Sequence, residues 1–300
     1  MARRSMELPP ARYDYGGDEF VFVELDRAMS LEANFKAMAI TSALQAENVE
    51  GVLDICSSNA SYLVRVDPER IHPAELVQHL ERLERSVAPL APDKVVRTRV
   101  VDVPVLYNDP WTHETLMRFR DAHQAPESTD LEYAARINGF ASVPELIEAL
   151  SGAPFLVTMV GFVPGLPFCY QMVPRRRQIE VPKYVRPRTD TPERAFGHGG
   201  AFSVVYPVRG AGGYQLFGLA PAPVFDLSQS LPDFHDSIVF PRPGDILRYR
   251  SIDRAEFDSV RAEVERGTFR YRIREFEFAP AHFLADPDGV NADILEVLYR

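Results

Sequence analysis

The sequence predicts an α+β fold in two parts, because the spacing of its apolar residues changes along the chain. Strand-like and helix-like segments alternate over the first third of the chain in the order βαββαβ. Short strand-like runs separated by Gly and Pro turns follow in the second half, which is typical of a β-barrel or β-sandwich. A chain of 300 residues is long enough to form two domains, each with its own core.

The first domain begins with a strand over residues 20–25. Ser30 is a residue type that favours a helix N-cap, and the helix that it starts is expected to end near residue 47. A strand over residues 51–57 follows, and a short loop joins it to another strand over residues 61–67. Apolar residues alternate along this last strand, so we expect one of its faces to be buried.

The second helix starts at Pro73, because proline suits the first position of a helix. The apolar residues of this helix fall on one face: Leu76, Val77, Leu80 and Leu83. A strand-like run over residues 95–106 completes the unit. This order is that of a split βαβ, or ferredoxin-like, domain, which implies no chemistry by itself.

A helical connection is expected next, because Thr129 and Ser142 each stand three residues before a glutamate, as in a capping box. Short helices are therefore expected over residues 130–138 and 143–150. The β-rich part has expected strands at 155–160, 201–208, 214–219 and 245–250, followed by a helix at 256–265, a strand at 269–278 and a helix at 293–299. We assign residues 12–106 to the ferredoxin-like domain, 107–152 to the helical connection and 153–300 to a β-barrel domain with a C-terminal extension.

Charge and composition exclude several classes of function. The formal net charge of −10 argues against a general nucleic-acid-binding protein, which needs clustered Lys and Arg for phosphate contacts. Two cysteines, Cys56 and Cys169, are too few for a disulfide framework and fit reduced thiols. No apolar stretch reaches the roughly 20 residues of a membrane span, and no histidine has metal-ligand spacing. We therefore expect a cytoplasmic protein without a metal site and without nucleic-acid or membrane partners.

Two glycine- and proline-rich motifs point to a binding site: GFVPGLPF at residues 161–168 and GGYQLFG at 212–218. Between them, residues 175–194 contain seven basic and three acidic side chains. Such a segment favours a carboxylate, a phosphate, bicarbonate or an acidic partner, but it also fits a solvated face with ion pairs. No phosphate-binding P-loop and no Gly-x-Ser-x-Gly motif is present, so nucleotide binding or serine catalysis by this chain alone has little support.

Arg188 is the strongest single candidate, because Pro187 fixes the backbone beside it and Thr189 adds a hydroxyl group. His198 lies among glycines, where it either titrates near neutral pH at the surface or packs inside. Gln215 offers a carboxamide either to a ligand or to the core. Cys169 is expected to pack as a small apolar residue.

The ordered set of motifs resembles the family of allophanate hydrolase subunit 1, KipI and the B subunit of 5-oxoprolinase, which comprises carboxyltransferase subdomains C and D. The family motif Gly-Phe-x-Pro-Gly-Phe-Pro matches residues 161–167 with Leu166 in place of Phe. Its Pro-Arg-Thr matches residues 187–189, and its Gly-Gly-Trp-Gln-x-x-Gly matches residues 212–218 with Tyr214 in place of Trp. The resemblance implies that the ferredoxin-like domain is followed by a cyclophilin-like β-barrel.

Other features look closer to the corresponding region of urea carboxylase, including Thr191-Pro-Glu193 and the long tail around residues 269–283. The family usually has an apolar residue at the position of His198, so the resemblance does not identify the substrate. Within the resemblance, the catalytic candidates are Arg188, His198 and Gln215, and the substrate-binding candidates are Pro164, Gly165, Thr189, Gly199, Gly200, Tyr206, Gly213 and Tyr214.

The resemblance implies one subunit of a multi-subunit enzyme that acts on a small amide or lactam, by ATP-dependent 5-oxoproline hydrolysis or by biotin-dependent carboxylation of urea or a related compound. No biotin-attachment motif and no ATP-grasp loop is found, so carboxybiotin or ATP would come through partner subunits. The implied partners are a carboxyltransferase subdomain A/B protein and either a biotin carboxylase with its carrier or a LamB/YcsF-type protein. The alternative is a KipI-like regulator that inhibits a sensor histidine kinase.

Overall fold

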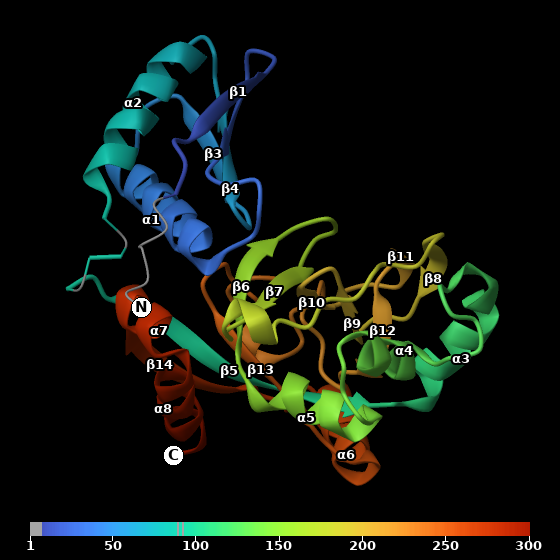
Figure 1. Cartoon of the computed structure of the whole chain (residues 1–300). Coiled ribbons are helices and arrows are strands. Elements are labelled where there is room, and N and C mark those ends of the chain that lie inside the picture. The colour runs from blue at the N-terminus through green and yellow to red at the C-terminus, as the bar shows by residue number, and fades with distance from the viewer. Residues whose placement is uncertain (1–7, 89, 92) are drawn as a thin grey trace. The chain divides into compact units, whose positions relative to one another are not determined.

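The structure is a computed structural model that describes residues 8–88, 90–91 and 93–300. The chain has a mixed α+β fold, as the sequence predicts (Figure 1). It divides into two compact units, the first made of the chain up to Val96 with Glu277–Asp286, the second of Arg97–Phe276 with Pro287–Arg300. The predicted boundaries after residues 106 and 152 do not coincide with this division, and the predicted helical connection belongs to the second unit.

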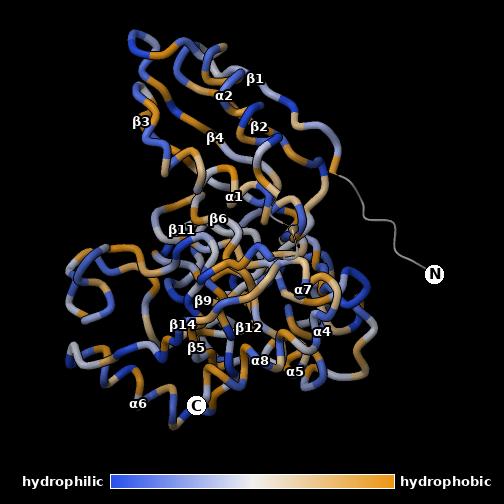
Figure 2. Tube along the Cα trace, turned by 90° about the vertical axis from the view of Figure 1, so that its left-hand side faces the viewer, coloured by the Kyte–Doolittle hydropathy of each residue, from blue (hydrophilic) through white to orange (hydrophobic). Residues whose placement is uncertain are grey.

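The first unit contains a four-stranded antiparallel sheet in the order β1-β2-β4-β3 and two helices that pack on it. Side chains from both helices and from β2 and β4 form its core. In Figure 2 the edge strand β1 is coloured blue to white, in keeping with its exposed position. The bounds are β1 Arg12–Gly16, β2 Phe20–Glu24, α1 Leu31–Glu47, β3 Val52–Ser57, β4 Ser61–Val66, α2 Pro73–Ser86 and, later in the chain, α7 Pro280–Ala285.

Local sequence explains most of these elements. The Ser30 side chain accepts a hydrogen bond from the Ala33 amide, and Pro73 lies in the first turn of α2, as predicted. Along β4, Tyr62, Val64 and Val66 are fully buried, which confirms the predicted alternation.

The elements follow the predicted βαββαβ order, but the last strand pairs elsewhere. β5 (Val96–Tyr107) does not join this sheet; β1 pairs with β2 instead and takes the edge position. A tight turn at Gly17, with φ of 67°, allows the β1–β2 hairpin, because glycine adopts this left-handed conformation without strain.

The second unit contains a sheet in the order β12-β9-β10-β7-β6-β13-β5-β14, and an additional pairing between β12 and β5 closes the first seven of these strands into a barrel. β8 and β11 form a separate two-stranded sheet. The bounds are β6 Phe155–Val160, β7 Pro167–Gln171, β8 Arg188–Thr191, β9 Ala195–Gly199, β10 Phe202–Val205, β11 Gly210–Gly212, β12 Gln215–Leu219, β13 Ile246–Ser251 and β14 Arg272–Phe278.

The helices of this unit pack against the barrel strands, α3 and α4 on β12 and α5 on β13. Aromatic rings fill the barrel: the Tyr249 ring centroid lies 4.6 Å from that of Phe196 and 5.2 Å from that of Phe155. The bounds are α3 Pro110–Phe119, α4 Asp130–Ile137, α5 Val143–Gly152, α6 Arg254–Glu265 and α8 Pro287–Tyr299, with 3-10 turns at Arg120–Ala122, Arg175–Arg177 and Pro232–Phe234. None of the helices in the described part of the chain has the length and apolar character needed to cross a membrane.

Two capping boxes were predicted, and one is complete. The Thr129 side chain accepts from the Glu132 amide, and the Glu132 carboxylate accepts from the Thr129 amide. At α5 the Ser142 hydroxyl accepts from the Glu145 amide, but the Glu145 carboxylate accepts from the Ala141 amide instead. Strands β1, β7, β8, β9 and β11 were not predicted. The glycines of β9 and β11 resemble turns, and β8 is a short polar strand.

Candidate functional site

Strand pairing brings the central site candidates together in the second unit. Arg188 on β8 lies opposite Gly212 on β11, and His198 on β9 lies opposite Gln215 on β12. The Tyr214 ring lies directly over Gly199, so closely that a Cβ atom at residue 199 would collide with it. The two motifs around residues 188 and 215 therefore meet in space.

Arg188 is fully buried, which is unusual for an arginine. Its Nε donates to Thr191 Oγ1 over 3.3 Å, and its guanidinium carbon lies 4.5 Å from the centroid of the Tyr184 ring. Its Nη1 and Nη2 atoms have no hydrogen-bond partner among the described residues. Unsatisfied charged donors in a low-dielectric interior are costly, so this guanidinium is set up to receive an oxygen ligand.

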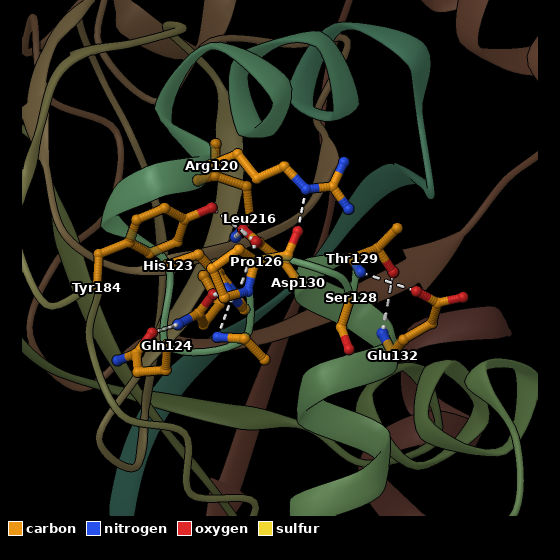
Figure 3. A network of polar contacts seen from close by, with 12 residues as sticks. Arg120, His123, Gln124, Pro126, Ser128, Thr129, Asp130, Glu132, Tyr184 and Leu216 are labelled. Atoms are coloured by element: carbon orange, nitrogen blue, oxygen red, sulfur yellow. Dashed lines mark hydrogen bonds and ion pairs between the residues drawn. The ribbon is translucent and has the colours of Figure 1, made fainter.

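A buried carboxylate, Asp130, lies at the start of α4 and contacts Tyr184, the residue whose ring lies under this arginine (Figure 3). Its Oδ1 accepts from the Tyr184 hydroxyl over 2.7 Å, and its Oδ2 accepts from the Leu216 amide over 2.5 Å. Burial raises the pKa of Asp130, while these two hydrogen bonds and the charge of Arg188 act in the opposite direction. Asp130 therefore connects two elements by hydrogen bonds: Tyr184, whose ring lies against the Arg188 guanidinium, and strand β12.

Gln215 is fully buried and its carboxamide is fully engaged. Its Oε1 lies 2.9 Å from His123 Nε2, and its Nε2 donates to the Pro182 carbonyl over 2.9 Å and to Gln124 Oε1 over 3.1 Å. The Ala125 amide donates to His123 Nδ1, so His123 carries its proton on Nε2 and donates it to Gln215. In this arrangement Gln215 joins β12 to the loop before α4.

His198 lies inside the barrel wall and is 1% exposed, so the sequence-based option of a surface imidazole is wrong. Its Nε2 donates to the Ile179 carbonyl over 2.8 Å, which leaves Nδ1 to accept from the Ser203 hydroxyl over 2.8 Å. Burial lowers the pKa of His198 to about 4, so the ring is neutral at physiological pH. Both nitrogens are occupied, and a catalytic role for His198 stays a prediction.

The remaining candidates divide between the interior and the surface. Tyr206 is buried with its hydroxyl near Gly212, and the charge of Arg188 partly offsets the rise in the pKa of Tyr206 that burial causes. Gly165 is buried against Phe225. Three candidates are exposed: Pro164, Thr189 and Gly200. Gly213 is half-buried and lies near Lys183 and Pro187.

Cys169 is fully buried, as expected for a packing residue, and burial raises its pKa to about 12. Its Sγ accepts from the Tyr249 hydroxyl over 3.1 Å. Within the described ranges, no group of three or more His, Cys, Asp or Glu side chains is arranged to hold a metal ion.

Sequence reasoning missed three residues of the buried network that joins Arg188 and Gln215: His123, Asp130 and Tyr184. His123 and Gln215 are 92 residues apart, and Asp130 and Tyr184 are 54 apart. No local spacing signals such contacts. An acidic residue in the first turn of a helix, as Asp130 is, is common and does not by itself indicate burial.

Comparison with known proteins gives a consistent result. Residues 11–234 match the model of the family described as carboxyltransferase domain, subdomain C and D. The B subunit of 5-oxoprolinase from Bacillus subtilis is 25% identical over 254 residues, which cover 82% of this chain and 95% of that protein. The urea amidolyase of Lachancea kluyveri is 22% identical over 289 residues, which cover 95% of this chain but only 16% of that protein.

Solved structures support the same fold. The crystal structure of the K. lactis urea amidolyase aligns with a TM-score of 0.83 at 20% identity, over 97% of this chain and 18% of that one. The Kluyveromyces lactis urea carboxylase aligns with a TM-score of 0.81 at 19% identity, over 97% of this chain and 27% of that one. The chain thus spans nearly the whole length of the 5-oxoprolinase B subunit but only a small part of the urea amidolyase and urea carboxylase chains.

Proposed function

We propose that this chain is one subunit of a multi-subunit enzyme acting on a small amide or lactam. The proposal starts from its family, since the chain belongs to the carboxyltransferase domain family of subdomains C and D. The family resemblance identified from the motifs at residues 161–167, 187–189 and 212–218 is confirmed by the match over residues 11–234. The curated relatives named above are subunits or domains of enzymes. The proposal extends that role to this chain.

The observation that supports a site on this chain is the buried Arg188 with its two unsatisfied nitrogen atoms. A planar guanidinium with free donors matches a carboxylate or a developing oxyanion, and it is most effective where water is excluded. We propose that Arg188 binds the anionic group of the substrate or intermediate. Asp130 and Tyr184 hold the guanidinium in place from below.

Access to Arg188 requires a second chain in this proposal. The guanidinium is fully buried, so the substrate reaches it only when the segment around Tyr184 shifts. Val185, next in the chain, is 70% exposed and would lie in the surface that such a partner covers. Docking of a carboxyltransferase subdomain A/B protein would provide both the shift and the second wall of the cavity. The chain alone is then inactive.

The cofactors belong to the partners in this scheme. Carboxybiotin, delivered by a carrier, would supply the carboxyl group for carboxylation, whereas ATP held on another chain would drive lactam opening. Arg188 would orient an anionic group in either reaction. Its unsatisfied donors fit an anionic oxygen, but its burial does not fit direct binding of a whole cofactor by this chain.

Of the two reactions, we favour biotin-dependent carboxylation of urea or a related amide. The urea amidolyase match covers 95% of this chain, whereas the match to the B. subtilis 5-oxoprolinase protein leaves 18% uncovered. The family match ends at residue 234, so the tail through α6, β14 and α8 goes beyond it. The second candidate is 5-oxoproline hydrolysis, which is supported by the coverage of 95% of the B. subtilis protein. In both cases the proposed architecture is a ferredoxin-like domain followed by a cyclophilin-like barrel.

The KipI-like regulatory role is not favoured, because the named curated relatives are an oxoprolinase subunit and an amidolyase. The test is reconstitution. The chain is co-purified with a subdomain A/B protein, and ATP turnover is measured with urea or 5-oxoproline after addition of biotin carboxylase with its carrier or of a LamB/YcsF-type protein.

Carboxylation requires bicarbonate and is blocked by avidin, whereas hydrolysis releases glutamate and needs neither biotin nor bicarbonate. Stable association together with either activity supports the enzyme subunit. Failure to associate with any subdomain A/B protein, combined with inhibition of a histidine kinase by the chain alone, would overturn the proposal.

A further inference from the structure

A cleft of about 650 Å³ opens in the second unit between α3, α6 and the turn that joins β8 to β9. Its lining includes Trp111, Arg194, Phe257 and Arg261, and it is called the α3–α6 cleft below. Four arginines and four acidic side chains among the described residues line it in all, so the position of each charge matters more than their sum. Small-molecule sites usually have volumes of roughly 300 to 1,000 Å³. None of the site candidates taken from the motifs lines this cleft, so its chemistry is separate from that of Arg188.

Arg194 is the most unusual residue of the α3–α6 cleft. Its φ is 65°, a left-handed backbone conformation that disfavours a residue with a long side chain. The surrounding strands hold it there: its amide donates to the Tyr206 carbonyl over 2.6 Å, and its carbonyl accepts from the Ala220 amide over 2.9 Å. Strained residues of this kind cluster at ligand-binding sites, where the strain fixes a side chain in its working position.

The Arg194 side chain is only 16% exposed, and its hydrogen-bonding capacity is not exhausted. One terminal nitrogen donates to Glu193 over 2.7 Å and the other to the Pro221 carbonyl over 3.3 Å. Nε is buried and has no hydrogen-bond partner in the part of the chain that the structure describes. A buried guanidinium therefore keeps one donor for another group.

A second arginine, Arg261 on α6, places another positive charge close to Arg194. Burial lowers the pKa of Arg194, and the positive charge of Arg261 lowers it further. In the two ion pairs of these arginines the carboxylate is the more exposed partner: 55% for Glu193 against 16% for Arg194, and 68% for Glu265 against 32% for Arg261. The cations thus lie deeper in the cleft than the carboxylates that partner them.

An apolar wall stands beside these cations. The rings of Trp111 and Phe257 stack with centroids 5.2 Å apart at an interplanar angle of 29°, and the Arg254 guanidinium carbon lies 5.0 Å from the centroid of the Trp111 ring. Leu219 and Pro192 also line the cleft. Cationic donors beside an aromatic wall suit a ligand with an anionic end and an apolar body, because the body displaces water from the rings while the anion pairs with the guanidinium groups.

We propose that the α3–α6 cleft binds a small organic carboxylate, with Arg194 and Arg261 contacting the carboxylate and Trp111 and Phe257 contacting the apolar body. A planar two-oxygen anion matches the guanidinium fork, and binding between the two arginines removes their mutual repulsion. The inference does not depend on the reaction proposed above.

Trp111 is the single tryptophan of the chain, so its fluorescence reports on this cleft directly. The full chain is titrated with benzoate, which has one carboxylate and an apolar ring, and with benzamide, which has nearly the same shape but no charge. We expect a saturable change in Trp111 fluorescence and a rise in melting temperature with benzoate, with an affinity at least tenfold weaker for benzamide. An equal response to both compounds, or a saturable response to neither, would overturn the proposal.

Two variants assign the binding to the arginines. Arg194→Gly removes the guanidinium and suits the positive φ, so the fold is retained while the dissociation constant for benzoate rises at least tenfold. Arg261→Gln provides an independent test on the surface of α6, with a rise of at least threefold. Arg176→Gln, an exposed arginine outside the cleft, is the matched control and leaves binding unchanged. Unchanged benzoate binding in Arg261→Gln and in a folded Arg194→Gly would contradict the assignment, and if Arg194→Gly does not fold, the Arg261→Gln result decides alone.

Discussion

The Tyr184 hydroxyl donates a hydrogen bond of 2.7 Å to Asp130 Oδ1, and both side chains are at least 96% buried. The same Tyr184 ring supports the Arg188 guanidinium on one face. A buried carboxylate depends on each hydrogen-bond donor that contacts it, because no water molecule can replace a lost donor. This pair therefore connects the stability of the second unit to the position of its central arginine.

Removing the hydroxyl tests this connection. Tyr184→Phe keeps the ring but leaves Asp130 with one donor fewer, and we expect a loss of about 1–3 kcal/mol in the free energy of unfolding. Chemical denaturation monitored by circular dichroism measures it. Tyr15→Phe, at a side chain that is 55% exposed, is the control and should change stability by less than about 0.5 kcal/mol. Equal effects of the two substitutions would show that Tyr184 contributes only its ring.

The buried His198 predicts a pH dependence of stability. Burial lowers the pKa of His198 from 6.5 to about 4 in the folded chain, whereas the unfolded chain keeps the ordinary value. Because the folded pKa is depressed, the stabilising contribution is complete above pH 6.5 and is lost as the pH falls to 4. The shift corresponds to at most about 3 kcal/mol.

His198→Gln isolates this contribution from the titration of carboxylates. The stability lost between pH 7 and pH 4 should be smaller in this variant than in the natural chain, by up to about 3 kcal/mol, in urea denaturation series. Identical pH profiles for the two proteins would mean that the imidazole is protonated as easily inside the barrel as in water.

Close packing of Gly199 against the Tyr214 ring predicts a large effect of a single methyl group. Gly199→Ala should destabilise the chain by about 1–3 kcal/mol, because the ring must move away from its site in the cluster with Tyr206 and Leu166. Gly210→Ala is the matched control, since nothing lies within 4 Å of a Cβ atom there and its φ is not positive. Thermal unfolding compares the two, and a Gly199→Ala variant as stable as Gly210→Ala would be inconsistent with the close contact.

The two thiols should differ in reactivity. Cys56 is exposed, whereas Cys169 is fully buried and its pKa is raised to about 12, so its nucleophilic thiolate is scarce. We expect one equivalent of thiol to react with a disulfide reagent in the native chain and two after unfolding in urea. A Cys56→Ser variant that still reacts at the same rate while folded would contradict the packing role of Cys169.

Local chemistry made much of the first unit predictable. Ser30, Pro73 and the alternation along β4 each act within a few residues, so caps and strand faces follow from the sequence. The sheet order did not follow, because the edge position could be taken by a strand from either end of the unit. β1, which has mostly polar and aromatic residues, was not recognised as a strand, and it takes the place expected for residues 95–106.

The candidate site was predictable only where its residues share a motif. The motifs pointed to Arg188, and strand pairing places it opposite Gly212 of the other motif. Neither its complete burial nor its contact with Tyr184 was foreseen, because both depend on chain segments that meet only in the folded state. The α3–α6 cleft was missed for the same reason: its lining comes from segments more than 60 residues apart, such as those of Trp111, Arg194 and Phe257.

The most direct test of the central claim is the turnover number of the assembled enzyme with Arg188→Ala. In the complex with its subdomain A/B partner, we expect this variant to associate normally and to lower kcat by about 100-fold or more, as expected when a buried oxyanion donor is lost. Arg176→Ala, at an exposed arginine of the same basic segment, should leave kcat unchanged. A kcat within about threefold of that of the natural complex would contradict a role for Arg188 in the reaction.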